Sequence, residues 1–329
     1  MKKLIVAPFC LVIFCLLFIS VNAQSSKKLP ELKVPANYKP LVTENSAALA
    51  ALLDSAVRET LEKFKDKNLK AENVAATLID LRESNFLKTA NFRGQDKIYP
   101  ASVVKMFYMN ALERRLEDGQ ITMSPELERG LRDMITVSSN EATQYVLDVL
   151  TGTSSGAEKS GKDYEKWKYQ RNAVNRFYAA LGFSNINANQ KTFCEDAYGI
   201  EQQFRGYNLG NNRNMLTTNA VARLLTEIVL GKTNTPERTK IMMDLMRRDW
   251  EAQIGKTDDR EFISYALKPG TKLWTKEGDT SKTRHDAAYI ETPDGLKFVI
   301  VIFTENFATE RDIIPSIAGK ILEDLGKTK

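Results

Sequence analysis

Segments typical of β-strands stand at both ends of this chain, and segments typical of helices lie between them. The apolar run at Val74–Leu81 is short and suits a strand. Near the other end, Asp286–Glu291 and Lys297–Thr304 are rich in strand-forming residues, and an Asp-Gly turn joins them as a hairpin. Strands from both ends can share a sheet only if the chain returns after its helices. We therefore expect an α+β fold, in which helices flank an antiparallel sheet and a helical lobe is inserted.

Helices are expected where apolar residues recur every three or four positions. The clearest is Ser46–Phe64, in which Ser46 suits the N-cap, and a second runs from Ser102 to Leu116. Further helices are predicted at Pro125–Ile135, Glu141–Leu150, Tyr164–Leu181, Thr218–Leu230, Glu237–Trp250 and Thr309–Leu325, a further strand at Lys272–Thr275, and a long loop at Asn185–Asn214.

The first 23 residues are typical of a secretory signal peptide. Lys2 and Lys3 precede an apolar run, Leu4–Val21, and small residues end it at Ala23. We predict cleavage after Ala23 and a periplasmic or secreted protein; an uncleaved membrane anchor is the alternative. A proline-containing linker is predicted at 24–44 and one domain at 45–329. The sheet would come from about 45–100 and 265–329, and the helical lobe from about 101–264.

Composition excludes several kinds of site. The formal net charge is only +5, so we expect no nucleic-acid partner. The chain has one histidine, His285, and three cysteines, too few for a structural zinc site or a histidine-based triad. Two cysteines lie in the leader, which leaves Cys194 as a free thiol that we expect to be buried. We predict a monomer that uses no metal and no organic cofactor.

Without a histidine base, a lysine can activate a serine if its amine is kept neutral. Ser102 and Lys105 have the spacing Ser-x-x-Lys at a helix start, which places hydroxyl and amine on one face. The helix N-terminus would favour anionic character at Ser102. The spacing alone is weak, since Ser25 and Lys28 repeat it in the linker.

Two further motifs follow in order and make the signal specific. A Ser-Ser-Asn tripeptide at 138–140 ends a helical run, and Lys-Glu-Gly at 276–278 ends a strand. With Ser102 and Lys105, this order resembles the class A serine β-lactamases and their penicillin-binding relatives, which carry S-x-x-K, S-D-N and K-T-G. The resemblance spans roughly 46–325. The interval between Ser102 and Ser138 is shorter than is usual in that family, so the predicted helical lobe is a trimmed one.

The resemblance implies a role for each motif residue. Ser102 would be the acylated nucleophile and Lys105 would help to take its proton. Ser138 would relay a proton to the leaving nitrogen, and Asn140 would bind the amide carbonyl of the substrate. Lys276 would supply positive charge for Ser138 and for a substrate carboxylate.

Further substrate contacts follow from the third motif. Gly278 ends it, and the backbone N–H of Asp279 would form an oxyanion hole with that of Ser102. Arg284, on the next strand, would bind a substrate carboxylate. We prefer it to the neighbouring His285, because arginine is always charged and can bind a carboxylate through two nitrogens.

The chain also departs from the family pattern. Glu277 replaces a hydroxyl residue and would repel a substrate carboxylate unless Lys276, Lys282 or Arg284 neutralises it. The family's deacylating carboxylate has no clear counterpart, and Glu195 and Glu201 are the candidates.

The leading hypothesis is a secreted serine hydrolase that opens an amide, foremost a β-lactam, through an acyl-enzyme on Ser102. Two alternatives stay open: a cell-wall peptidase, transpeptidase or esterase of the same fold, and a binding protein that kept the fold without the chemistry. The expected partner is accordingly a small-molecule or peptide amide.

Overall fold

A computed structural model describes residues 29–83, 86–207, 210–253 and 262–327. Its centre is a seven-stranded sheet with the order β1-β3-β2-β7-β6-β5-β4, antiparallel throughout except for the β1–β3 pair. The strands are β1 (Glu44–Asn45), β2 (Val74–Asp80), β3 (Lys88–Phe92), β4 (Arg247–Arg248), β5 (Lys272–Asp279), β6 (Thr283–Glu291) and β7 (Lys297–Glu305). Strands from both ends of the chain therefore pair in one sheet, and the α+β prediction is confirmed.

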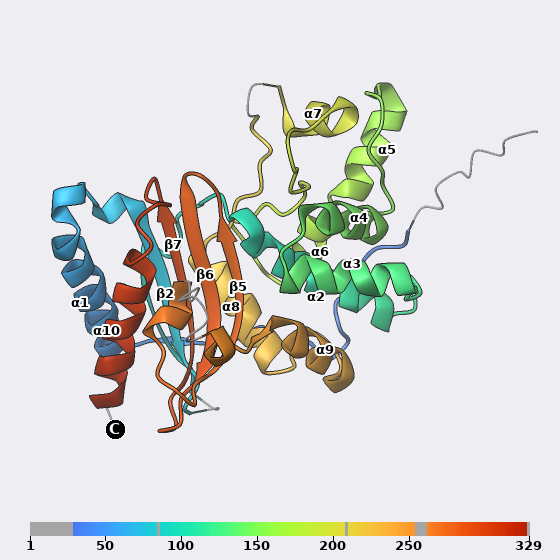
Figure 1. Cartoon of the computed structure of the whole chain (residues 1–329). Coiled ribbons are helices and arrows are strands. Elements are labelled where there is room, and N and C mark those ends of the chain that lie inside the picture. The colour runs from blue at the N-terminus through green and yellow to red at the C-terminus, as the bar shows by residue number, and fades with distance from the viewer. Residues whose placement is uncertain (1–28, 84–85, 208–209, 254–261, 328–329) are drawn as a thin grey trace, which may run out of the picture.

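Helices cover both faces of the sheet (Figure 1). On one face lie α1 (Ala47–Lys63) and α10 (Ile313–Lys327); on the other lies α8 (Thr218–Val229). β7 shows why both faces are covered: alternate side chains, such as Ile300 and Val301, belong to different apolar clusters, and both are fully buried.

The helical lobe stands beside the β5 edge of the sheet, on the side covered by α8 (Figure 1). Its helices are α2 (Val104–Glu117), α3 (Pro125–Thr136), α4 (Asn140–Thr151), α5 (Gly161–Arg171), α6 (Ala173–Ala180), α7 (Gly199–Arg205) and α9 (Pro236–Met246). α2 is the buried axis of this lobe, since all but its last residue are buried. A helix buried all round is held rigidly, so its first turn is a fixed platform.

Most predicted elements are present, with four differences. The helix expected at Tyr164–Leu181 is broken at Asn172 into α5 and α6. The long loop at Asn185–Asn214 contains the short helix α7, and the strand β3 was not predicted. Lys272–Thr275 proves to be the first half of a longer strand, β5. These misses are short elements whose own periodicity is too brief to detect.

The segment predicted to be a linker is fastened to the lobe over its described part. Leu32 is buried, and the hydroxyl of Tyr38 donates to the buried carboxylate of Glu227. The guanidinium of Arg115 donates to the carbonyl of Pro30 at 2.8 Å. The predicted signal peptide lies outside the described residues. Within them, no helix has the length and apolar character needed to cross a bilayer.

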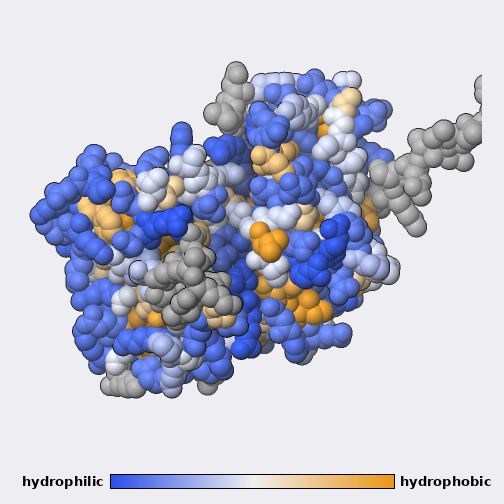
Figure 2. Space-filling model, viewed as in Figure 1, coloured by the Kyte–Doolittle hydropathy of each residue, from blue (hydrophilic) through white to orange (hydrophobic). Residues whose placement is uncertain are grey.

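The face of the molecule seen in Figure 2 is mostly hydrophilic, and apolar residues appear on it in small separate groups. Scattered apolar residues of this kind are normal for a soluble surface. That face therefore gives no reason to expect a large apolar partner.

Candidate active site

Ser102 lies in a tight turn that leads directly into α2. Residues Ala101–Val103 form a 3₁₀ turn, and the α-helix begins at Val104. Ala101 has a φ of 46°, a left-handed conformation that costs a residue with a side chain about 1–3 kcal/mol. Lys105 follows within the first turn of α2 and is fully buried, while Ser102 is partly exposed. Ser102 and Lys105 thus lie at the start of a buried helix, in the turn before it and in its first turn respectively.

The second motif lies at the junction of α3 and α4 and contacts Lys105 directly. Ser139 caps α4, accepting a hydrogen bond from the N–H of Ala142, and Ser138 has a φ of 57°. The amine of Lys105 donates to the Ser138 carbonyl at 2.5 Å, to the Ser138 hydroxyl at 3.2 Å and to Oδ1 of Asn140 at 2.8 Å. The first two motifs therefore share one hydrogen-bond network.

The third motif, at residues 276–278, packs directly against the turn that contains Ser102. A Cβ at Gly278 would lie 2.8 Å from the carbonyl oxygen of Pro100, 2.8 Å from the backbone nitrogen of Ser102 and 2.9 Å from that of Val103. Only glycine allows β5 to approach the Ser102 turn so closely. Lys276 alternates onto the same face of the sheet as Gly278, so all three motifs meet in one place.

The electrostatics of this place suit a lysine base. Burial, together with the positive charge of Lys276, lowers the pKa of the Lys105 amine to about 7, against weaker opposing effects of Cys194, Glu141 and Asp279. At neutral pH a large fraction of Lys105 is therefore unprotonated and can accept a proton. Burial also lowers the pKa of Lys276, which the negative charge of Glu277 opposes.

Glu277 is held by two cations. Its carboxylate lies 3.3 Å from the Lys276 amine, 3.2 Å from Nε of Arg248 and 3.4 Å from Nη2 of Arg248. Burial alone would raise the pKa of Glu277, but these two charges bring it below the ordinary value. Lys276 was a predicted partner and Arg248 was not. Of the other two predicted partners, Lys282 is exposed and Arg284 stacks elsewhere.

Arg284 and His285 point to opposite faces of β6. The guanidinium of Arg284 lies 3.9 Å from the ring centroid of Phe262. Arg284 is opposite Asp279 in the strand register, on the sheet face away from Lys276 and Gly278. His285 is fully buried on the lobe face, and its Nε2 lies 2.9 Å from the carbonyl of Tyr99. Burial lowers the pKa of His285 to about 4, so it is a neutral brace for the segment before Ser102.

Glu201 belongs to a buried ion-pair network. Its two carboxylate oxygens accept from the guanidinium of Arg171 at 2.7 and 2.9 Å, and Lys191 lies 3.3 Å away. Asp148 on α4 contacts the same two cations, which ties α4, α5 and α7 together. A carboxylate engaged in this way is poorly placed to accept a proton from water. The geometry therefore favours a structural role for Glu201 over the predicted catalytic one.

We expect Glu201→Gln to lower the free energy of unfolding by about 3–5 kcal/mol, because it leaves the buried Arg171 and Lys191 to share the carboxylate of Asp148, so that one buried positive charge is uncompensated. Glu195→Gln is the matched control. Glu195 is exposed on the same loop and should change stability by less than about 0.5 kcal/mol. Urea denaturation of both variants measures the difference. Equal stabilities would show that the network contributes nothing to holding the loop.

Glu195 follows Cys194, whose thiol contacts Glu141 beside the second motif. Cys194 is exposed, contrary to the buried thiol expected, and its Sγ donates to Oε1 of Glu141 at 3.1 Å. This hydrogen bond raises the pKa of the thiol, which makes Cys194 a weaker nucleophile. Glu141 was not among the carboxylates predicted to act at the site. It follows Asn140 directly, so its position in the motif was the available signal.

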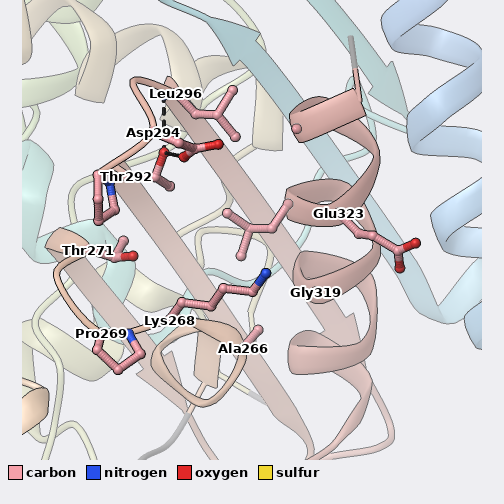
Figure 3. A pocket seen from close by; sticks show the side chains of 12 residues that line it. Ala266, Lys268, Pro269, Thr271, Thr292, Asp294, Leu296, Gly319 and Glu323 are labelled. Carbon is pink, nitrogen blue, oxygen red and sulfur yellow. Dashed lines mark hydrogen bonds between the residues drawn. The ribbon is translucent and has the colours of Figure 1, made fainter. Parts of the chain in front are cut away.

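A well-formed cavity among the described residues lies away from these motifs. It has a volume of about 630 Å³ and is bounded by the hairpin turn around Asp294, by the segment around Pro269, and by Gly319 and Glu323 of α10 (Figure 3). It is on the α10 side of the sheet, at the end of β5 opposite Gly278. The described residues also include no cluster of three or more histidine, cysteine, aspartate or glutamate side chains that could hold a metal ion.

Comparison with known proteins agrees with this geometry. Three solved structures illustrate the likeness: a β-lactamase from Sphaerobacter thermophilus (19% identity, TM-score 0.60, covering 84% of this chain and 98% of that one), the protein PBP-A (18%, 0.58, 88% and 99%) and a β-lactamase from Chitinophaga pinensis (17%, 0.59, 83% and 99%). At such identities the likeness shows the fold. No curated protein sequence matches the chain.

The fold and the three converging motifs define a β-lactamase-like serine hydrolase. A family model described as "Beta-lactamase enzyme family" matches residues 124–325, more than half of the chain. The chain therefore belongs to this family.

Proposed function

We propose that this protein opens an amide or related acyl bond through a covalent acyl-enzyme on Ser102. The observation that carries the proposal is the Lys105 amine. It is fully buried, it has a pKa of about 7, and it belongs to the residue three positions after Ser102, in the first turn of α2. A desolvated lysine beside a serine is a base positioned for its nucleophile.

The steps follow from the contacts. Lys105 takes the proton of the Ser102 hydroxyl as its oxygen attacks the carbonyl carbon. The bond to the leaving nitrogen then breaks, and Ser138, which accepts a hydrogen bond from Lys105, returns a proton to that nitrogen. Asn140 has its Oδ1 engaged by Lys105, which leaves its NH₂ group to donate to the substrate carbonyl.

The developing oxyanion would be held by the N–H groups of Ser102 and Asp279. In support, Gly278 brings the end of β5 against the backbone nitrogen of Ser102. Donors fixed in place before the reaction cost no reorganisation when charge develops. Water then hydrolyses the ester on Ser102. Glu195 and Glu141 are the carboxylates left to activate it, because Glu201 is engaged by Arg171.

Incubation with a fluorescent penicillin and with a fluorophosphonate, followed by peptide mapping, tests the proposal. The expected result is an adduct on the peptide that contains Ser102, from at least one reagent. An adduct on another residue, or none with either reagent, would remove Ser102 from this role.

β-Lactams are the first substrates to test, but one observation favours the second candidate. Glu277 places a negative charge at the motif position where the family carries a hydroxyl residue. A peptidase, transpeptidase or esterase acting on a different acyl compound fits that charge better. Turnover of a chromogenic cephalosporin separates the two, because labelling of Ser102 without turnover indicates the second.

From the predicted leader we propose that the protein acts in the periplasm or outside the cell. We also propose that it is a monomer. N-terminal sequencing of protein from the periplasm or medium checks the location. A start at Gln24 supports cleavage, and a membrane-bound protein with an intact leader supports the anchor. Light scattering checks the oligomeric state.

A further inference from the structure

The cations at the end of β5 already hold a carboxylate that belongs to the chain. Arg248 and Lys276 lie 3.2 and 3.3 Å from the oxygens of Glu277. β4 pairs only with Leu273 and Trp274 of β5. After Trp274, β5 is itself the edge strand of the sheet, and the side chain of Glu277 in this part of β5 contacts Arg248. Both cations are therefore already paired with Glu277 when no substrate is bound. A free carboxylate would have to displace Glu277 or bind beside it.

The charged groups near Lys105 that have no ion-pair partner among the described residues are acidic. Asp279 is exposed at the end of β5 and makes no described ion pair. Glu141 is also exposed, and its described side-chain contacts are the neutral donors Ser139 and Cys194. Both carboxylates lie close enough to act electrostatically on Lys105. Negative charge on these two carboxylates therefore lies near Lys105.

We propose that Glu277 is a specificity-determining residue that turns this site away from anionic substrates and towards acyl compounds whose leaving group carries an ammonium. The inference rests on the proposed function, since it concerns the same site. The leaving group is the relevant part because, in the proposed reaction, Ser138 protonates the leaving atom. Lys276, which is paired with Glu277, acts electrostatically on Lys105, the hydrogen-bond donor to Ser138. Opposite charges attract and like charges repel by about 1 kcal/mol each at 4 Å in water, so the two classes should differ about tenfold to a hundredfold.

A matched series of phenylacetyl thioesters tests this preference. The thiol leaving group is thiocholine (cationic), 2-mercaptoethanol (neutral) or 3-mercaptopropionate (anionic), and the released thiol is measured in quenched aliquots. We expect the wild-type kcat/KM to be about tenfold or more higher for the cationic than for the anionic ester. Glu277→Gln should shrink this ratio about tenfold, and Glu277→Thr should do the same if the first variant is unstable.

The control is Glu72→Gln, which removes an exposed carboxylate before β2 and should leave the ratio unchanged. Equal rates for the cationic and anionic esters, or an unchanged ratio in both Glu277 variants, would overturn the proposal.

Binding of the same three esters to the Ser102→Ala variant, measured by calorimetry, separates this inference from the proposed function. If the wild type hydrolyses none of the esters, the proposed reaction fails for this series, and the affinities still decide the charge preference. Tighter binding of the cationic ester supports the inference. Binding of the anionic ester that is as tight as that of the cationic one contradicts it.

Discussion

Replacing Lys105 with methionine is expected to slow acylation of Ser102 by about 10²–10⁴-fold, the usual contribution of a positioned base. Methionine keeps the length and the apolar stem of the side chain, so it preserves packing in a position that is fully buried. What it removes is the amine that holds Ser138 and Asn140 and takes the proton. Single-turnover labelling with a fluorescent penicillin or fluorophosphonate measures the rate. The Ser102→Ala variant, which lacks the proposed nucleophile, gives the background labelling.

The dependence of the acylation rate on pH should follow the protonation of Lys105. Acylation needs neutral Lys105, and burial lowers the pKa of this amine to about 7. The wild-type rate should therefore rise with pH, reach half its maximum near pH 7 and level off above it. An ordinary lysine, with a pKa near 10.4, would still be rising at pH 9. A rate that does not change between pH 6 and 8, or a methionine variant as fast as the wild type, would remove Lys105 as the base.

Gly278→Ala is expected to lower the acylation rate by about 10²–10³-fold, the cost of losing one oxyanion donor. The added Cβ would lie within 2.9 Å of three backbone atoms, those of Pro100, Ser102 and Val103. Backbone atoms of a buried turn cannot swing aside as a flexible side chain can. The end of β5 would have to retreat and would carry the N–H of Asp279 away from Ser102.

Gly326→Ala is the control for this prediction. Gly326 lies near the end of α10, and a Cβ there would meet nothing within 4 Å. Its labelling rate should match the wild type. Circular dichroism and thermal unfolding show whether Gly278→Ala remains folded. A folded Gly278→Ala protein that labels at the wild-type rate would contradict the proposed oxyanion hole.

Much of the site was accessible from sequence because each motif lies at the end of a regular element. Ser102 lies in the turn that leads into α2, Ser139 caps α4, and Lys276 lies in the second half of β5, so local periodicity and capping are enough to place them. Their order along the chain then indicated a single family. The convergence of the three motifs could be expected from that resemblance, but their contacts could not.

The neighbours that decide what each charge does were not accessible. Arg248 neutralises Glu277 across two strands, and Arg171 engages Glu201 across two helices of the lobe. Nothing local in the sequence links either pair, since 28 or more intervening residues can fold back in many ways. The exposure of Cys194 is of the same kind, because it depends on how a weakly periodic loop is laid over α4.

The sequence by itself determined which residues are the candidates for the chemistry, because local hydrophobic periodicity, helix caps and motif spacing are properties of short stretches of chain. Only the tertiary structure decided that Lys105 is desolvated, that Glu277 is paired and that Glu201 is engaged in a structural network. The physical reason is that burial and charge pairing depend on groups brought together from distant parts of the chain, and they set the protonation state on which the chemistry depends.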